Sequence, residues 1–421
     1  MQVRRIATID GCICRYREQV KMRHPLQWTE GKTFPQPRTS AGPVRSVIPC
    51  GGQGNLKGKY KLLTEKLPEL GRGNRKCLPF RGIFGRHCFG GTKRVMKVYL
   101  LACSGYSERQ GADLLLAQVD EEGRCSVLGG CRQGGNPSFC TRHGDFLYVL
   151  SEVAGGASIS ACRIVGEKIL KTGREIQVPG CELCHLYAGE RALYGSCYGS
   201  GDFFAVDYEL KELLWHRTSQ TVLEGMDITP HAHWSAEWDG QLFLADLGSD
   251  RIWRYRLQEG LPEEELPALV LPAGAGPRQL LPTGDSRYLL SVQEPGSTLC
   301  MWKWRGEYLE CVQTVRTTGF SGENYPGTIC MADERTVLVC NRGANTLSAF
   351  SIDSEGLKML GEWETVNWPR YLMRIPDTSL FVNACNKAGK LVTFMWTGRS
   401  LEKRDEIALP GASCAAFWGL R

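Results

Sequence analysis

The feature that most constrains the fold is a repeat of about 47 residues, the length of one four-stranded propeller blade. An apolar segment that ends in a polar turn recurs seven times, and its end residues lie 44–49 positions apart. These segments are KVYLLACS (Ser104), FLYVLSE (Glu152), ALYGSCY (Tyr198), LFLADL (Leu247), YLLSVQE (Glu294), TVLVCNR (Arg342) and LFVNACN (Asn386). We call the seven end residues the first column. Most of them are followed by a Gly-, Asn- or Ser-rich turn and a further strand, which is typical of a β-hairpin.

A second set of segments recurs in step with the first. The segments are NPSF, ELCH, PHAH, GPRQ, YPGT and WPRY, and their last residues, the second column, are Phe139, His185, His233, Gln279, Thr328 and Tyr371. No comparable run shows helical periodicity. The sequence therefore predicts an all-β, seven-bladed β-propeller over residues 96–421. The closing segment IALPGASCAAFWGL is expected to supply the strand that joins the last blade to the first.

Residues 1–95 differ sharply in composition from the rest of the chain. They carry a net charge of +15, against −9 for residues 96–421, and show scattered Gly, Pro and Arg without strand or helix periodicity. This favours a disordered basic extension rather than a second domain. Three interpretations stay open: a transit-like segment, a nucleic-acid-binding tail, or upstream sequence that precedes a biological start at Met96.

Composition narrows the class of protein further. No stretch reaches 18 consecutive apolar residues, and the N-terminus lacks the apolar core of a secretory signal, so we expect a cytoplasmic protein with no membrane partner. Most of the 14 cysteines after position 95 sit in apolar strand-like runs, which indicates reduced core thiols. Cys181 and Cys184 form a CxxC pair without a second pair at zinc spacing, and we expect no metal and no cofactor. We expect no nucleic-acid partner, and a monomer or weak homo-oligomer.

Charged side chains interrupt the two columns in neighbouring repeats. Because blades present equivalent positions around one axis, we expect these side chains to converge at one mouth of the ring and to bind a small anionic substrate. The predicted catalytic residues are His231, His233, Arg278 and Glu294, and the predicted substrate-binding residues are Arg342, His185 and Arg370. Each of these residues could instead form a structural contact between blades. This alternative is strongest for His185 and Arg370. Asp246 and Asp250 are interpreted as turn and blade-linking residues.

Several of these segments carry a resemblance to a known family. They include CHLYAGERALYGSCYGSG, PHAHWSAEWDGQLFLADLGSDRIWRY, GAGPRQLLPTGDSRYLL, VQEPGSTL, CNRGANTLSAF and WPRYLMRIPDTSLFVNA. In them the chain resembles the lactonase family of seven-bladed propellers, which includes 6-phosphogluconolactonase and the carboxymuconate-lactonising enzyme. Family members usually have His where this chain has Gln279, and His-Asp where it has Ala344 and Asn345.

The resemblance implies hydrolysis of a sugar lactone, most concretely 6-phosphogluconolactone to 6-phosphogluconate, a pentose phosphate pathway step. It places the functional histidine on His231 or His233, and the arginines and glutamate on Arg278, Arg342 and Glu294. Either a histidine or Glu294 could take a proton from water, while arginines stabilise an oxyanion and hold an anionic group. The alternatives are a carboxymuconate-type lactonising cycloisomerase and a non-catalytic propeller that binds a ligand or a protein.

Overall fold

A computed structural model of the protein describes residues 96–106, 111–219, 227–306 and 308–421. Within these residues the chain forms seven antiparallel sheets of four strands each, as the repeat predicts. The expectations for residues 1–95 lie outside the described residues. In the described part of the chain, no helix is long and apolar enough to span a membrane.

The strands occupy four positions in each sheet, from the centre of the ring outward. The innermost strands are β4 (Cys140–His143), β8 (Leu183–Ala188), β12 (Ala232–Trp238), β16 (Pro277–Pro282), β20 (Tyr325–Asp333), β24 (Pro369–Arg374) and β28 (Ala412–Leu420). The second strands are β1 (Val98–Gly105), β5 (Phe146–Val153), β9 (Leu193–Cys197), β13 (Gln241–Asp246), β17 (Tyr288–Gln293), β21 (Thr336–Arg342) and β25 (Leu380–Cys385).

The third and outermost strands complete each blade. The third strands are β2 (Leu114–Asp120), β6 (Gly156–Val165), β10 (Asp202–Val206), β14 (Arg251–Gln258), β18 (Thr298–Arg305), β22 (Thr346–Asp353) and β26 (Lys390–Trp396). The outermost strands are β3 (Cys125–Cys131), β7 (Lys168–Val178), β11 (Leu213–Thr218), β15 (Leu261–Val270), β19 (Tyr308–Arg316), β23 (Gly356–Glu364) and β27 (Leu401–Ala408).

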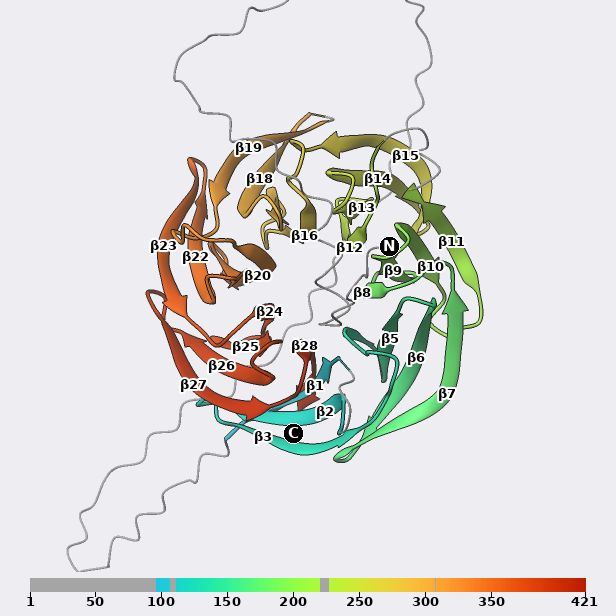
Figure 1. Ribbon diagram of the computed structural model, residues 1–421, viewed down its shortest axis with the longest axis vertical. Helices are drawn as coiled ribbons and strands as arrows, with labels where there is room; N and C mark the ends of the chain where they lie inside the picture. Colours follow the sequence, from blue (N-terminus) through green and yellow to red (C-terminus); the bar gives the residue numbers. More distant parts are fainter. Residues whose placement is uncertain (1–95, 107–110, 220–226, 307) are drawn as a thin grey trace, which may run out of the picture. The chain divides into compact units, whose positions relative to one another are not determined.

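The seven blades close into a ring. Each innermost strand contacts the innermost strand of the next blade, in the order β4, β8, β12, β16, β20, β24, β28 and back to β4. Figure 1 shows these strands around a common axis with the outermost strands at the periphery. We number the blades in chain order, so that blade 1 holds β1 to β3 and blade 7 holds β24 to β27.

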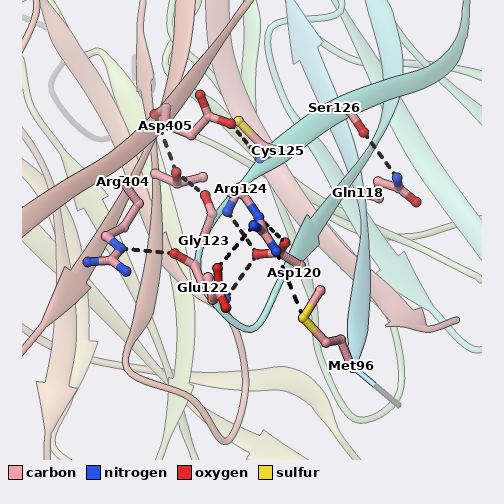
Figure 2. Close-up of polar contacts among 11 residues, drawn as sticks. Met96, Gln118, Asp120, Glu122, Gly123, Arg124, Cys125, Ser126, Arg404 and Asp405 are labelled. Atoms are coloured by element: carbon pink, nitrogen blue, oxygen red, sulfur yellow. Dashed lines mark hydrogen bonds and ion pairs between the residues drawn. The ribbon is translucent and has the colours of Figure 1, made fainter. Parts of the chain in front are cut away.

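The C-terminal strand closes the ring, as the sequence predicts. Strand β28 pairs with β1, with Ala416 opposite Ala102, and becomes the innermost strand of blade 1. Blades 7 and 1 also meet near their outer edges, as Figure 2 shows. There Arg404 Nε donates to the Glu122 carbonyl at 2.9 Å, and the Cys125 amide donates to Asp405 Oδ2 at 2.9 Å. The pairing with β28 covers the edge of β1, which would otherwise be unpaired.

Burial follows the position of each strand in its blade. Strand β21 is buried along its whole length, whereas most residues of β7 are exposed or partly buried. Strands covered on both faces read as continuous apolar runs, which is why the second strands carry the clearest repeat signal. The core lies between blades: one cluster joins Leu290 and Met301 of blade 5 to Val339 and Phe350 of blade 6.

Candidate active site

Both sequence columns lie at the same mouth of the ring. In each blade the innermost and second strands are antiparallel, so the start of one lies beside the end of the other. The register pairs Ala232 with Asp246, and Pro277 with Gln293, next to the column residues Leu247 and Glu294. The polar residues of the two columns therefore approach the axis at one level of the ring.

A β-bulge interrupts four of the segments that end in the second column. The pairing of innermost with second strands skips one residue in blades 3, 4, 5 and 7, and the skipped residues are Cys184, His233, Arg278 and Arg370. These four positions are therefore structurally equivalent. His185 and His233 are not, although their four-residue segments align them in the sequence. The equivalent of His185 in blade 4 is Trp234.

Glu294 of blade 5 holds two arginines at the axis. Its carboxylate forms ion pairs with Arg278 Nη1 and with Arg342 Nη2 of blade 6, the latter at 2.7 Å. Arg342 also donates through Nε to the Tyr325 carbonyl at 2.8 Å and through Nη2 to the Pro326 carbonyl at 3.1 Å. The Arg278 and Arg342 side chains are only 6% and 5% exposed, and Glu294 retains 19%. The structure thus brings these three predicted residues into one cluster.

The two arginines fix the charge of Glu294. Burial alone would raise the pKa of this carboxyl, but the charges and hydrogen bonds of Arg342 and Arg278 outweigh burial and lower it to about 2. Glu294 is therefore ionised at every physiological pH. A carboxylate with so low a pKa is a weak proton acceptor, which favours an anchoring role over that of a general base.

His233 lies beside this cluster as an uncharged imidazole. Burial, followed by the positive charges of Arg278 and Arg370, holds its pKa well below the usual value. Its Nδ1 atom is buried and has no hydrogen-bond partner within the described residues. His233 can therefore contact a substrate without adding positive charge to the site.

His231 occupies a different environment from His233. Its Nδ1 lies 2.9 Å from the Tyr198 carbonyl oxygen of blade 3, and its ring stacks on that of Tyr198 with centroids 4.3 Å apart. Its main-chain amide donates to Asp246 Oδ1 at 2.8 Å. The two contacts with Tyr198 link blade 4 to blade 3 and favour the structural alternative for His231. Asp246 also accepts from the Ser249 amide at 3.2 Å, as expected of a turn residue.

His185 takes part in a recurring link between neighbouring blades. Its Nδ1 accepts from the Ser235 amide at 3.3 Å, and its ring stacks on Trp234 at 3.6 Å. Gln279 makes the same kind of link twice, accepting from the Ile329 amide at 2.6 Å and donating to the Ile329 carbonyl at 3.1 Å. This geometry favours the structural alternative for His185. It also gives Gln279 a packing role at the position where the family usually has histidine.

A second carboxylate, Glu152 of blade 2, was missed in the sequence. It accepts hydrogen bonds from Tyr106 Oη at 2.9 and 3.0 Å and from the Ser138 hydroxyl. Burial raises the pKa of Glu152 despite the opposing effects of Arg370, Ser138 and Tyr106. Glu152 ends the second strand of its blade as Glu294 does in blade 5, so membership of the first column was the signal that could have found it.

Arg370 interacts electrostatically with both carboxylates, Glu152 and Glu294. Burial opposes its charge, but Tyr106, Glu152, Cys184 and Glu294 together outweigh that effect and raise its pKa. Its guanidinium carbon lies 5.3 Å from the centre of the Tyr106 ring. These interactions place Arg370 with Arg278, Arg342, Glu294, Glu152 and His233, which together we call the axial cluster. A role of Arg370 in substrate binding stays a prediction.

The cluster combines three arginines, two glutamates and a neutral histidine, which leaves an excess of positive charge. Such a set can hold an anionic group and stabilise an oxyanion that forms next to it. The 14 cysteines of the described residues are free, and Cys184 is a buried thiol whose pKa is raised by burial and then by Glu152. In the same part of the chain, no group of three or more His, Cys, Asp or Glu side chains could hold a metal ion.

Comparisons with known proteins bear on this architecture. Residues 100–417 match the family model described as "Lactonase, 7-bladed beta-propeller". The chain is 24% identical over 309 residues to a 6-phosphogluconolactonase of Bacillus subtilis strain 168, an alignment that covers 67% of this chain and 87% of that protein. It is 33% identical over 136 residues to a 6-phosphogluconolactonase of Erwinia tasmaniensis, with 31% of this chain and 41% of that protein covered.

Solved structures share the fold. The periplasmic gluconolactonase of Pseudomonas aeruginosa superposes with a TM-score of 0.68 at 21% identity, over 77% of this chain and all of that one. A Lactobacillus plantarum protein superposes with the same score at 19% identity, over the same shares. At these identities the likeness concerns the fold.

Proposed function

The chain belongs to the lactonase family of seven-bladed β-propellers, and from this premise we propose that it hydrolyses 6-phosphogluconolactone to 6-phosphogluconate. Relatives from Bacillus subtilis and Erwinia tasmaniensis carry the name 6-phosphogluconolactonase. The observation that carries the proposal is the excess of arginine over carboxylate at the axis. Arg278, Arg342 and Arg370 face Glu152 and Glu294, which suits a lactone that bears a phosphate.

In the proposed reaction, water adds to the lactone carbonyl and forms a tetrahedral oxyanion. The buried arginines Arg278 and Arg342, both held by Glu294, stabilise the negative charge on the carbonyl oxygen. Such preorganised donors cost no reorganisation when the charge develops. The carbon–oxygen bond of the ring then breaks, and the ring oxygen leaves as a hydroxyl after accepting a proton.

Glu152 is the proposed proton carrier. Its raised pKa brings it nearer to neutral pH than Glu294, whose pKa is about 2, while the pKa of His233 lies far below its usual value. General bases work best when their pKa lies near the working pH. Glu152 accepts the proton of the attacking water and later gives it to the leaving ring oxygen. Tyr106 and Ser138 orient the carboxylate through their hydrogen bonds.

The proposal also concerns the cellular compartment, the pathway and the cofactor requirement of the reaction. We propose a cytoplasmic enzyme of the oxidative pentose phosphate pathway that acts on a small anionic sugar lactone without a metal or cofactor. Every side chain that the mechanism uses comes from blades 1, 2, 5, 6 and 7 of a single chain.

The test is hydrolysis by the purified full-length chain. We expect 6-phosphogluconolactone to disappear faster than it does spontaneously, and Arg278→Ala to lower kcat/KM by about 10²–10³-fold, as loss of one oxyanion donor does. Arg305→Ala is the matched control, because Arg305 pairs with Glu310 on the exposed surface. A wild-type rate equal to the spontaneous rate would refute the proposed function, whereas equal losses in both variants would refute the role of Arg278.

A further inference from the structure

Two cationic side chains lie over the indole ring of Trp368, next to the axial cluster. The ammonium nitrogen of Lys387 lies 3.3 Å from the ring centre of Trp368, and the guanidinium carbon of Arg342 lies 5.7 Å from the same centre. Lys387 follows the first-column residue Asn386, so it lies at the same mouth of the ring as Glu294 and Arg342. Trp368 directly precedes Pro369, at the start of the innermost strand of blade 7.

The backbone holds Trp368 in a conformation that a bulky residue rarely adopts. Its φ is +65°, in the left-handed region. The amide of Trp368 donates to Asn345 Oδ1 at 2.8 Å, and its carbonyl accepts from the Asn386 amide at 2.9 Å. Asn345 is one of the two residues at which this chain departs from the family pattern after NRG. Blades 6 and 7 thus fix the indole in place, and strained positions of this kind concentrate at ligand sites.

The cations on this indole retain binding capacity. Lys387 is exposed and forms no ion pair within the described residues, so its ammonium group can still donate to an anionic ligand. The contacts of Arg342 use Nε and Nη2, and its Nη1 has no partner in the same part of the chain. The nearness of Arg342, after partial burial, lowers the pKa of Lys387. A bound dianion would relieve this repulsion between like charges.

We propose that Lys387, Trp368 and Arg342 form a subsite for the phosphate of a phosphorylated sugar lactone. The inference rests on the proposed function for the identity of the ligand and names the residues that select it. Lys387 supplies a mobile point charge to the phosphate, Arg342 contributes Nη1, and the indole gives the sugar an apolar surface. The lactone carbonyl then lies toward Arg278, which pairs with the same Glu294 carboxylate as Arg342.

Kinetics with two substrates test the subsite in the full-length protein. KM and kcat are measured for 6-phosphogluconolactone and for unphosphorylated gluconolactone in the wild type, Lys387→Met, Lys387→Arg and Lys358→Met. We expect Lys387→Met to lower the preference for the phosphorylated substrate about tenfold, through KM, the effect of one charge-assisted contact. Lys387→Arg keeps the charge and most of the preference. Lys358, an exposed residue of outermost strand β23, is the matched control. A preference unchanged in Lys387→Met would overturn the inference.

Calorimetric titration separates the two proposals, because it needs no turnover. The titrants are the products 6-phosphogluconate and gluconate. We expect the wild type to bind 6-phosphogluconate more tightly than gluconate. In Lys387→Met, the ratio of the two dissociation constants should fall about tenfold. If neither lactone is hydrolysed but this pattern appears, the proposed function fails and the subsite stands. If the lactones are hydrolysed but both products bind equally, the subsite fails and the function stands.

Discussion

Arg342 of blade 6 lies 2.7 Å from Glu294 of blade 5, so a buried ion pair crosses from one blade to the next at the axis of the ring. Arg278 pairs with the same carboxylate from within blade 5. A buried carboxylate that holds two arginines is costly to remove, because both positive charges then lose their partner. Glu294 therefore stabilises the contact between blades 5 and 6 and also holds the arginines of the candidate active site in place.

Glu294→Gln should destabilise the protein in a pH-dependent way. The pKa of Glu294 falls from the usual 4.5 to about 2 in the folded state, so its stabilising effect is complete above pH 4.5 and disappears as the pH falls toward 2. At pH 7 we expect the variant to lose about 3 kcal/mol of unfolding free energy, and the difference from wild type to narrow below pH 4.5. Denaturant titration at several pH values measures this difference. Glu310→Gln, at an exposed pair with Arg305, should change stability by less than about 0.5 kcal/mol.

The pH dependence of kcat/KM should identify the proton carrier. If Glu152 accepts the proton, the rate rises with pH along an acidic limb whose midpoint lies above the usual pKa of 4.5, because burial raises the pKa of Glu152. Tyr106→Phe removes a donor that favours the carboxylate form, so the limb should move to higher pH. Glu152→Gln should lower kcat by about 10²–10⁴-fold. If Tyr106→Phe leaves the acidic limb unchanged but His233→Gln abolishes it, His233 rather than Glu152 is the proton carrier.

Gln279→Ala should weaken the ring while sparing catalysis. The Gln279 side chain bonds both the amide and the carbonyl of Ile329 in the next blade, and its loss leaves two buried main-chain groups unpaired. We expect a loss of about 2 kcal/mol in unfolding free energy, with kcat changed less than about threefold. Thermal and denaturant unfolding measure the first quantity. Gln258→Ala, at an exposed position of β14, is the control and should show neither effect. A large fall in kcat at unchanged stability would instead place Gln279 in the site.

The sequence was sufficient to predict the blades because their signal is local. Strands buried on both faces read as apolar runs, and a fixed spacing maps each run to one place around the axis. The same reasoning grouped Arg278, Glu294 and Arg342, whose side chains form ion pairs in the structure, because equivalent positions of a ring lie around one axis. Their roles in catalysis and substrate binding stay predictions.

Which neighbour in a segment faces the axis could not be predicted. That choice depends on the bulges at Cys184, His233, Arg278 and Arg370, and one extra residue reverses the alternation of side chains on a strand. For this reason the segments aligned His185 with His233, although one links blades and the other lies in the cluster. Glu152 was missed because its role depends on Tyr106, Ser138 and Arg370, which come from three different blades.

Removal of the C-terminal strand should open the ring and unfold the protein. Strand β28 is the innermost strand of blade 1, where it pairs with β1 and contacts β4 and β24. A chain that ends at Pro410 lacks this strand, together with its buried residues Cys414 and Ala415, and exposes the edge of β1. We expect loss of cooperative unfolding in circular dichroism and aggregation in size-exclusion chromatography. Deletion of Arg421 alone removes only contacts at the surface, such as its ion pair with Glu167, and should leave the transition nearly unchanged. A truncated chain that unfolds cooperatively at the wild-type temperature would show that the other six blades hold the ring without this closure.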